Sequence, residues 1–257
     1  MQDLQRENKT TSKQEQPQYQ LLTGNAGLML DKIPNESVDV CFTSPEPPMN
    51  HYEMMSLVAD MMTVNQVMKP SGSIWVELAD YHNTEGDMTL IPERFLHWMV
   101  IENGWHLRSK LIWHRTDHYI KEAIPTDNTR FKRDYEYLFW FVKNNPGYYI
   151  NKDCLLYNMY TNSSIIEAEC RDVPEGEFGT NFPGKLVVMA MDLTLPDKGV
   201  ALDPYSGTAT TGIAVVNRGC KYIGIDRDEQ LQYKADLRLK TCLMTPAEKS
   251  RVMLGIS

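Results

Sequence analysis

Short apolar runs alternate with longer amphipathic segments along most of this chain, and this alternation limits the fold more than any other feature. The run Val38–Phe42 reads as a buried strand, and the segment 53–69 carries its apolar residues at helical spacing. The alternation continues to a strand over 222–225 and a helix from about 229 to 241. Strands that alternate with helices predict an α/β fold with a mostly parallel, twisted sheet and helices on both faces.

Length and composition indicate a single domain. The 257 residues suit one full core better than two, and the polar residues 1–18 predict a disordered tail ahead of a domain over 19–257. The chain has no apolar run of membrane-spanning length and no signal-peptide pattern, so we expect a cytoplasmic protein with no membrane partner. Its five cysteines and six histidines form no ligand spacing, and we expect no metal site.

A proline-rich segment follows the strand at Val38–Phe42. Thr43 and Ser44 precede Pro45, and two further prolines follow Glu46. Because proline fixes φ and restricts the residue before it, the segment is expected to be rigid and extended. Open α/β sheets bind ligands at the carboxyl ends of strands, which is where this segment lies. Taken alone, however, such a loop is more often a plain connection than a site.

The segment 200–226 has the organisation of a nucleotide-binding βαβ unit. A short apolar strand leads into a loop of small residues that begins at Asp203, and the next strand ends at Asp226, 23 positions later. Small residues let the backbone approach a ligand, and an acid after the following strand hydrogen-bonds ribose hydroxyls. The loop has neither Gly-x-Gly-x-x-Gly nor Gly-Lys-Ser/Thr, which indicates a nucleoside without a phosphate chain. S-adenosylmethionine is the common ligand of this kind.

The order of these motifs resembles the β-class of S-adenosylmethionine-dependent DNA amino-methyltransferases, which have a permuted motif order. In that family a Ser/Asn/Asp-Pro-Pro-aromatic motif comes first, a target-recognition region follows, and a Phe-Pro segment precedes an Asp-Pro-Phe-x-Gly-x-Gly-Thr-Thr loop. Here Thr43-Ser44-Pro45, Asn181-Phe182-Pro183 and Asp203–Thr211 occur in that order. The resemblance covers roughly residues 20 to 240 and implies a Rossmann-like methyltransferase fold with a small target-recognition insert around 114–181. The Ser-Pro start is similar to the N4-cytosine members.

The resemblance also implies which residues hold the cofactor. The loop that begins at Asp203 would hold the methionine part of S-adenosylmethionine, and Asp226 would bind the ribose hydroxyls. Asn25 stands where the family usually has Asp, and its carbonyl oxygen can still accept from the adenine amine. The implied cofactor residues are Asn25, Phe182, Pro183, Asp203, Pro204, Tyr205, Ser206, Gly207, Thr208, Thr210 and Asp226.

The segment around Ser44 suits amine methylation but departs from the family after Pro45. The exocyclic amine of cytosine is a poor nucleophile, and fixed acceptors for its N–H groups pull the nitrogen towards a tetrahedral shape. Ser44 Oγ and the Pro45 carbonyl are the expected acceptors for a flipped base. Glu46 replaces the second proline, and we hypothesise that it accepts from the amine or takes its proton; the alternative is that it points to solvent. The stacking aromatic is missing, and Tyr52 or His51 is its expected substitute.

The charge distribution indicates a DNA-binding face. The net charge of the chain is −8, yet residues 106–152 hold nine Lys/Arg against five Asp/Glu, a local charge of +4. A basic segment in an acidic protein is either a solvated face or a phosphate-binding surface, and the second reading is favoured here. The expected DNA contacts are Arg115, Arg130, Lys132 and Arg133.

The sequence therefore predicts a DNA methyltransferase that makes N4-methylcytosine, in a restriction-modification setting. Methylation at carbon 5 usually needs a Pro-Cys nucleophile, and no cysteine here follows a proline. N6-adenine methylation is the alternative within the same chemistry, and a catalytically silent module that binds cofactor or DNA is the alternative from another class. RNA or a free base is a third substrate class. A homodimer and a partner restriction nuclease stay open.

Overall fold

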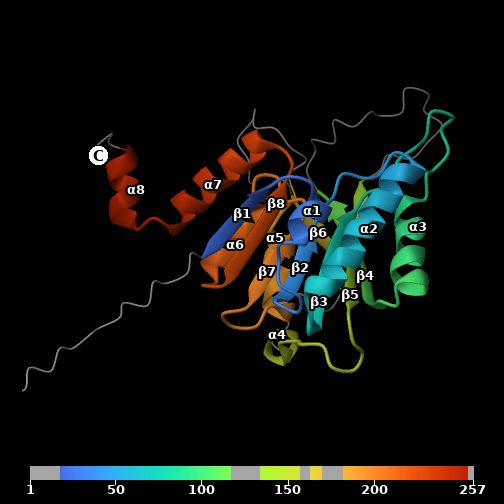
Figure 1. Cartoon of the computed structure of the whole chain (residues 1–257), viewed down its shortest axis with the longest axis horizontal. Helices are drawn as coiled ribbons and strands as arrows, with labels where there is room; N and C mark the ends of the chain where they lie inside the picture. The colour runs from blue at the N-terminus through green and yellow to red at the C-terminus, as the bar shows by residue number, and fades with distance from the viewer. Residues whose placement is uncertain (1–17, 117–133, 157–162, 170–181, 254–257) are drawn as a thin grey trace, which may run out of the picture.

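The computed structural model describes residues 18–116, 134–156, 163–169 and 182–253, and within these ranges eight strands form one sheet (Figure 1). The order across the sheet is β1-β8-β7-β2-β3-β5-β4-β6. The strands are β1 (Tyr19–Thr23), β2 (Val38–Thr43), β3 (Met68–Leu78), β4 (His106–Arg115), β5 (Tyr135–Val142), β6 (Ile165–Ala168), β7 (Val200–Asp203) and β8 (Lys221–Asp226). The predicted tail over 1–18 lies, apart from its last residue, outside the described ranges.

The strand directions confirm the prediction of a mostly parallel sheet. β1, β8, β7, β2 and β3 run parallel to one another, and β6 runs parallel to β4. β5 is antiparallel to both of its neighbours, β3 and β4. Parallel strands end at the same edge of a sheet, so the loops after β2, β3, β7 and β8 meet at one edge, which we call the carboxyl edge.

Helices cover both faces of the sheet, as the sequence predicts. The helices of one face are α1 (Ala26–Leu30), α2 (His51–Val67) and α3 (Ile91–His97). Those of the other are α5 (Gly184–Thr194), α6 (Thr210–Asn217) and α7 (Glu229–Leu243). Figure 1 shows α7 and α8 (Pro246–Met253) at the β1 end of the sheet. No helix within the described ranges is long and apolar enough to cross a membrane.

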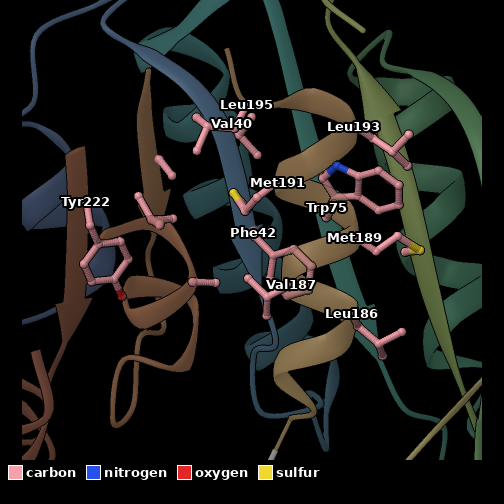
Figure 2. Packing of buried hydrophobic residues seen from close by; sticks show 14 of the residues in the cluster. Val40, Phe42, Trp75, Leu186, Val187, Met189, Met191, Leu193, Leu195 and Tyr222 are labelled. Carbon is pink, nitrogen blue, oxygen red and sulfur yellow. The ribbon is translucent and has the colours of Figure 1, made fainter. Parts of the chain in front are cut away.

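Alternating side chains divide the core into two layers. Val40 and Phe42 of β2 and Trp75 of β3 belong to the layer under α5, and Figure 2 shows them packed with Met191 of that helix. Cys41, between the first two, belongs to the layer under α2. Successive side chains of a strand point to opposite faces, and both faces of β2 are covered, which is why the run in the sequence is apolar except for Asp39.

Several elements differ from the prediction. The sequence predicts a single helix over 92–103, with an early proline at its start and Asn103-Gly104 as its stop. In the structure this segment is α3 followed by a π-helical turn, η1 (Trp98–Glu102), after which the backbone N and the Nδ2 of Asn103 donate to Trp98 O at 3.0 and 2.8 Å. The apolar run 73–78 predicts a strand, and in the structure β3 begins five residues before this run because its start pairs with Val38. The sequence does not predict α4 (Lys152–Leu156), β6 or α8. These short elements carry too few residues to show a periodic pattern.

The expected insert around 114–181 contributes two strands to the main sheet. β5 lies between β3 and β4, and β6 pairs with β4. Three other parts of this span lie outside the described residues: 117–133, 157–162 and 170–181. A separate recognition insert therefore stays a prediction, confined to the parts of the span that are not in β5 and β6.

Gly212 of α6 makes a tight contact whose effect on stability is measurable. A Cβ at this position would lie 2.5 Å from the ring of Tyr222 in β8, closer than van der Waals contact allows. We expect Gly212→Ala to lower the free energy of unfolding by about 1–3 kcal/mol, measured by urea denaturation. Adding Tyr222→Leu removes the clashing ring, so the double variant should lose less than the sum of the two single losses. Additive losses would contradict the contact.

Candidate active site

The two segments singled out in the sequence lie side by side at the carboxyl edge. The serine segment (residues 43–49) follows β2 and the small-residue loop (residues 203–211) follows β7, and these strands are parallel neighbours. Thr43 Oγ1 donates a hydrogen bond to Asp203 Oδ1 at 2.9 Å, although the two residues are 160 positions apart. The sheet thus joins the segment expected to bind an amine to the loop expected to bind a cofactor.

Asp203 is the buried centre of this junction. Besides the bond from Thr43, its carboxylate accepts from Tyr205 N at 3.2 Å and from Thr211 Oγ1 at 2.7 Å. Burial raises the pKa of Asp203 to about 6, although the three hydrogen bonds favour its charged form. Because these donors come from β2 and from both ends of the small-residue loop, Asp203 fixes the shape of that loop.

Tyr205 anchors the small-residue loop to α2. Its hydroxyl donates to Asp60 Oδ2 at 2.5 Å, and Asp60 also accepts from the backbone of Gly27. Asp60 is 8% exposed, and burial raises its pKa. The family pattern has Phe where this chain has Tyr205, so the hydroxyl adds a bond that a phenylalanine cannot make.

Asp226 lies at the end of β8, beside the small-residue loop. Its Oδ2 accepts from Gly207 N and its Oδ1 from Asp228 N, both at 2.9 Å. Gly207 has φ +49°, in the left-handed region that favours glycine, and a Cβ there would meet no atom within 4 Å. An ionised carboxylate has about four lone-pair sites, so Asp226 retains acceptor capacity for the hydroxyls of a ligand.

Ser44 has a partner that the sequence reasoning missed. Its Oγ donates to Glu77 Oε2 in β3 at 2.5 Å, and Glu77 is 5% exposed. Burial raises the pKa of Glu77 well above its usual range, and the neighbouring Glu136 of β5 raises it further. The sequence contained one indication of this partner, since Glu77 lies inside the apolar run 74–78. A carboxyl group buried in a strand needs a partner.

Glu46 lies on the surface of the serine segment. Its side chain is 92% exposed, and its Oε2 lies 3.7 Å from Nη2 of Arg227, the residue after Asp226. This position corresponds to the solvent-facing alternative for Glu46. The carboxyl group bound to Ser44 in this structure is that of Glu77.

Phe182 and Pro183 lie on the α5 face of the sheet. The Phe182 ring packs edge-on against Phe42 of β2 and Trp113 of β4, with ring centroids 5.1 and 5.5 Å apart. Pro183 is the N-cap residue of α5. These contacts hold the Phe-Pro segment against the strand that leads into Ser44.

Three further candidates lie at the starts of helices. Asn25 caps α1, since its Oδ1 accepts from Leu28 N at 3.4 Å. His51 and Tyr52 begin α2, and both side chains are exposed, that of Tyr52 by 87%. An exposed ring directly after the serine segment is available to stack on a base.

The rest of the small-residue loop is held from two sides. Ser206 N donates to a backbone carbonyl of β8 at 2.8 Å. The carbonyl and Oγ1 of Thr208 accept from Nη1 of Arg238 in α7 at 2.8 and 2.6 Å. Pro204 is buried, and Thr210 begins α6. The loop is therefore fixed between β8 and α7.

Of the expected DNA contacts, only Arg115 lies in the described ranges. Its Nη1 lies 2.9 Å from Oε1 of Glu136, and the two side chains are 19% and 10% exposed. An arginine in a largely buried ion pair is poorly placed to bind a phosphate. Arg130, Lys132 and Arg133 lie outside the described residues.

Comparison with protein families gives the class of the chain. The model of the DNA methylase family, named for N6 and N4 methyltransferases, matches residues 53–236. The chain belongs to the DNA methylase family. Two type II methyltransferases are similar to it, each at 22% identity: M.XycI of Xanthomonas campestris pv. cyanopsidis over 86% of this chain and 87% of its own, and M.Cfr9I of Citrobacter freundii over 80% and 82%.

Solved structures confirm the fold of this DNA methylase. The PvuII DNA methyltransferase, described as cytosine-N4-specific, has a TM-score of 0.78 at 17% identity and covers 92% of this chain and 91% of its own. A DNA modification methylase from Thermus thermophilus, solved with S-adenosyl-L-methionine, has a TM-score of 0.68 at 20% identity, over 88% and 94%. The expected Rossmann-like methyltransferase fold is thereby confirmed.

The family match begins after the serine segment. Residues 43–49 precede the matched range 53–236 of this DNA methylase, so the place of the serine segment in the site depends on its own contacts. Those contacts are the bond from Thr43 to Asp203 and the bond from Ser44 to Glu77. Within the described residues, no three His, Cys, Asp or Glu side chains are grouped as metal ligands.

Proposed function

We propose that this DNA methylase transfers a methyl group from S-adenosylmethionine to the exocyclic N4 amine of cytosine in DNA. The observation that carries the proposal is the 2.9 Å hydrogen bond between Thr43 and Asp203, which joins the serine segment to the small-residue loop. Methyl transfer needs its two reacting atoms aligned and about 3–3.5 Å apart, and this junction brings both binding elements to one edge. The Ser-Pro start and the similarity to a cytosine-N4-specific methyltransferase support cytosine as the base.

The residues at the carboxyl edge fit S-adenosylmethionine. The open side of Gly207 lets a ligand approach the backbone, and the acceptor capacity of Asp226 suits ribose hydroxyls. Asn25 lies after β1, the neighbour of β8, where its amide suits the adenine amine. When bound, the cofactor supplies a methyl group activated by a positively charged sulfur.

Ser44 and Pro45 are the proposed acceptors for the amine. Ser44 directs its hydroxyl hydrogen to Glu77, so its oxygen lone pairs are available for an N–H of the base. The Pro45 carbonyl takes the second N–H in this scheme. We assign the carboxyl group that acts with Ser44 to Glu77 rather than to the exposed Glu46, and a stacking ring to Tyr52 or His51.

The basic run Arg130, Lys132 and Arg133 is the proposed DNA contact, without Arg115, which binds Glu136. We expect the triple alanine variant to bind DNA more weakly, because each lost phosphate contact removes one released counterion. The slope of log K against log[salt] should become shallower by about 2–3. Fluorescence anisotropy with labelled duplex DNA over a salt series measures both quantities.

A matched control for the basic run removes two lysines from the opposite edge of the sheet. Lys198 precedes β7 and Lys221 begins β8, and both side chains are exposed. The double variant Lys198→Ala/Lys221→Ala should keep the wild-type slope, since these positions lie at the amino ends of the strands. A triple variant of the basic run with the same slope as this control would reject the DNA assignment.

Nucleoside mass spectrometry tests the proposed function directly. DNA from cells that express the chain is digested and compared with DNA from cells without it. N4-methylcytosine is the expected product, and N6-methyladenine would select the alternative within the same chemistry. If neither product forms in DNA while the chain still binds cofactor or DNA, the silent module is selected. A methylated nucleoside in RNA would select the third substrate class.

Both named relatives are type II methyltransferases, which supports a restriction-modification role for this chain. A cytoplasmic location is part of the same proposal. A partner restriction nuclease is part of that proposal. A homodimer is a further proposal, and sedimentation of the purified chain with and without duplex DNA distinguishes it from a monomer.

A further inference from the structure

A row of four polar side chains crosses the sheet behind the serine segment. Ser44 directly follows β2, Glu77 lies in β3, Glu136 in β5 and Arg115 in β4, and these strands are consecutive in the sheet. Alternation along each strand puts all four on one face. Each is two positions from a residue of the core layer under α5, namely Phe42, Trp75, Leu138 and Trp113.

A hydrogen bond joins the two residues at each end of the row. Ser44 Oγ donates to Glu77 Oε2 at 2.5 Å, and Arg115 Nη1 donates to Glu136 Oε1 at 2.9 Å. The two glutamates are 5% and 8% exposed; Glu77 pairs across the sheet with Leu138, two positions from Glu136, and the nearby Glu136 raises the pKa of Glu77. Two buried carboxyl groups in contact do not both ionise, so the pair holds one proton.

The donors around the two glutamates locate that proton. Glu77 Oε1 is buried and accepts from no donor among the described residues, whereas Glu136 accepts from the Arg115 guanidinium. The charged guanidinium of Arg115 is therefore paired with Glu136 rather than with Glu77. A proton on Glu77 Oε1, donated to Glu136, satisfies the orphan oxygen and agrees with the raised pKa of Glu77.

We propose that Glu77 and Glu136 form a proton-sharing pair that takes up, through Ser44, the proton that the substrate amine loses on methylation. This inference rests on the proposed function. As the amine nitrogen bonds to the methyl carbon, the carbon–sulfur bond breaks and the nitrogen carries one surplus proton. That proton passes to Ser44 Oγ, the Ser44 hydroxyl proton to Glu77 Oε2, and the proton of Glu77 Oε1 to Glu136. Ser44 and Glu77 end neutral, as they began, and Glu136 becomes neutral.

Each member of the row has a separate role in this scheme. Glu77 orients the hydroxyl of Ser44, and because it is neutral it can accept a proton only by passing one on. Glu136 is the final acceptor, and Arg115 keeps it ionised before the reaction. The Glu136 side chain is 10% exposed, which gives the proton a way out to water. Glu136 acts through Glu77 and is therefore a positioning residue rather than a catalytic one.

The variant Glu136→Gln tests the pair because it keeps the shape of the side chain and removes the ionised acceptor. We expect kcat for methyl transfer to fall about 10²-fold, with the KM for cofactor and the Kd for DNA unchanged. Glu77→Gln should lose a similar factor, and the double variant should lose no more, because the two groups act as one unit.

Asp39→Asn is the matched control. Asp39 is a buried acid in β2, 7% exposed and paired with Lys69 at 2.8 Å, at the opposite end of the strand from Ser44. This variant should keep the wild-type kcat while it lowers stability. Wild-type kcat in Glu136→Gln, or a double variant whose loss equals the product of the single losses, would overturn the pair alone. Absence of methyl transfer by the wild type would overturn the proposed function and the pair together.

Discussion

Ser44→Ala should lower the rate of methyl transfer about 10²–10³-fold while cofactor binding stays at the wild-type level. The Ser44 hydroxyl is held by Glu77 Oε2 at 2.5 Å, which fixes its oxygen for the amine. Loss of one preorganised hydrogen-bonding group from an active site costs about 2.7–4 kcal/mol of transition-state stabilisation. Single-turnover assays with radiolabelled cofactor measure the rate, and calorimetric titration measures the cofactor affinity.

Ser73→Ala separates this effect from a general loss of structure. Ser73 is a buried serine of β3 whose Oγ accepts from Trp140 Nε1 at 3.2 Å, and it lies four positions before Glu77 in the same strand. Its removal leaves a buried donor unsatisfied and should reduce stability by about 1–3 kcal/mol without changing the rate of the folded enzyme. Equal rate losses in the two serine variants would show that Ser44 has only a structural role.

Asp203→Ala should both destabilise the protein and abolish cofactor binding. The variant removes the acceptor for the hydroxyls of Thr43 and Thr211 and for the backbone of Tyr205, all around a side chain that is 4% exposed. Buried donors left without an acceptor cost about 1–3 kcal/mol each, so we expect the free energy of unfolding to fall by about 3 kcal/mol or more. Urea denaturation and calorimetric titration with the cofactor measure the two losses.

Asp203→Asn isolates the charge of the same side chain. The pKa of Asp203 is raised from 3.8 to about 6 in the folded protein, so its contribution to stability is complete below pH 3.8 and is lost as pH rises through about 6. The lost contribution is about 3 kcal/mol. Asparagine does not titrate, so the stability of the variant relative to the wild type should rise with pH across this window and stay constant above it. Parallel stability curves from pH 4 to 7 would contradict a buried, titrating Asp203.

Local sequence patterns were sufficient to predict those elements of the fold whose apolar residues form a continuous run or a regular repeat. β2 was predicted because four of the five residues of Val38–Phe42 are apolar, and α2 because its apolar residues repeat at helical spacing. The sequence did not predict β6 or the antiparallel direction of β5. Both depend on the neighbours with which a strand pairs, and strand propensity does not specify those neighbours.

The residues of the candidate site also divide into those that the sequence predicted and those that it did not. Ser44, Asp203 and Asp226 were found because proline and small residues at strand ends mark ligand loops, and because the order of the motifs matches a family. Glu77 was missed and Arg115 was expected on a DNA-binding surface, since a charged residue in a strand does not reveal its neighbours across the sheet. Pairing of β3, β5 and β4 brings these two residues into the row behind Ser44.

By itself, the sequence determined the α/β class, the two ligand loops and the family resemblance, because each of these is indicated by short motifs whose residues are close together in the chain. Only the tertiary structure decided that Thr43 bonds to Asp203, that Glu77 rather than Glu46 binds Ser44, and that Arg115 is paired with Glu136. These contacts join residues on different strands, and the register of the sheet, which is set by the packing of the whole core, brings them together.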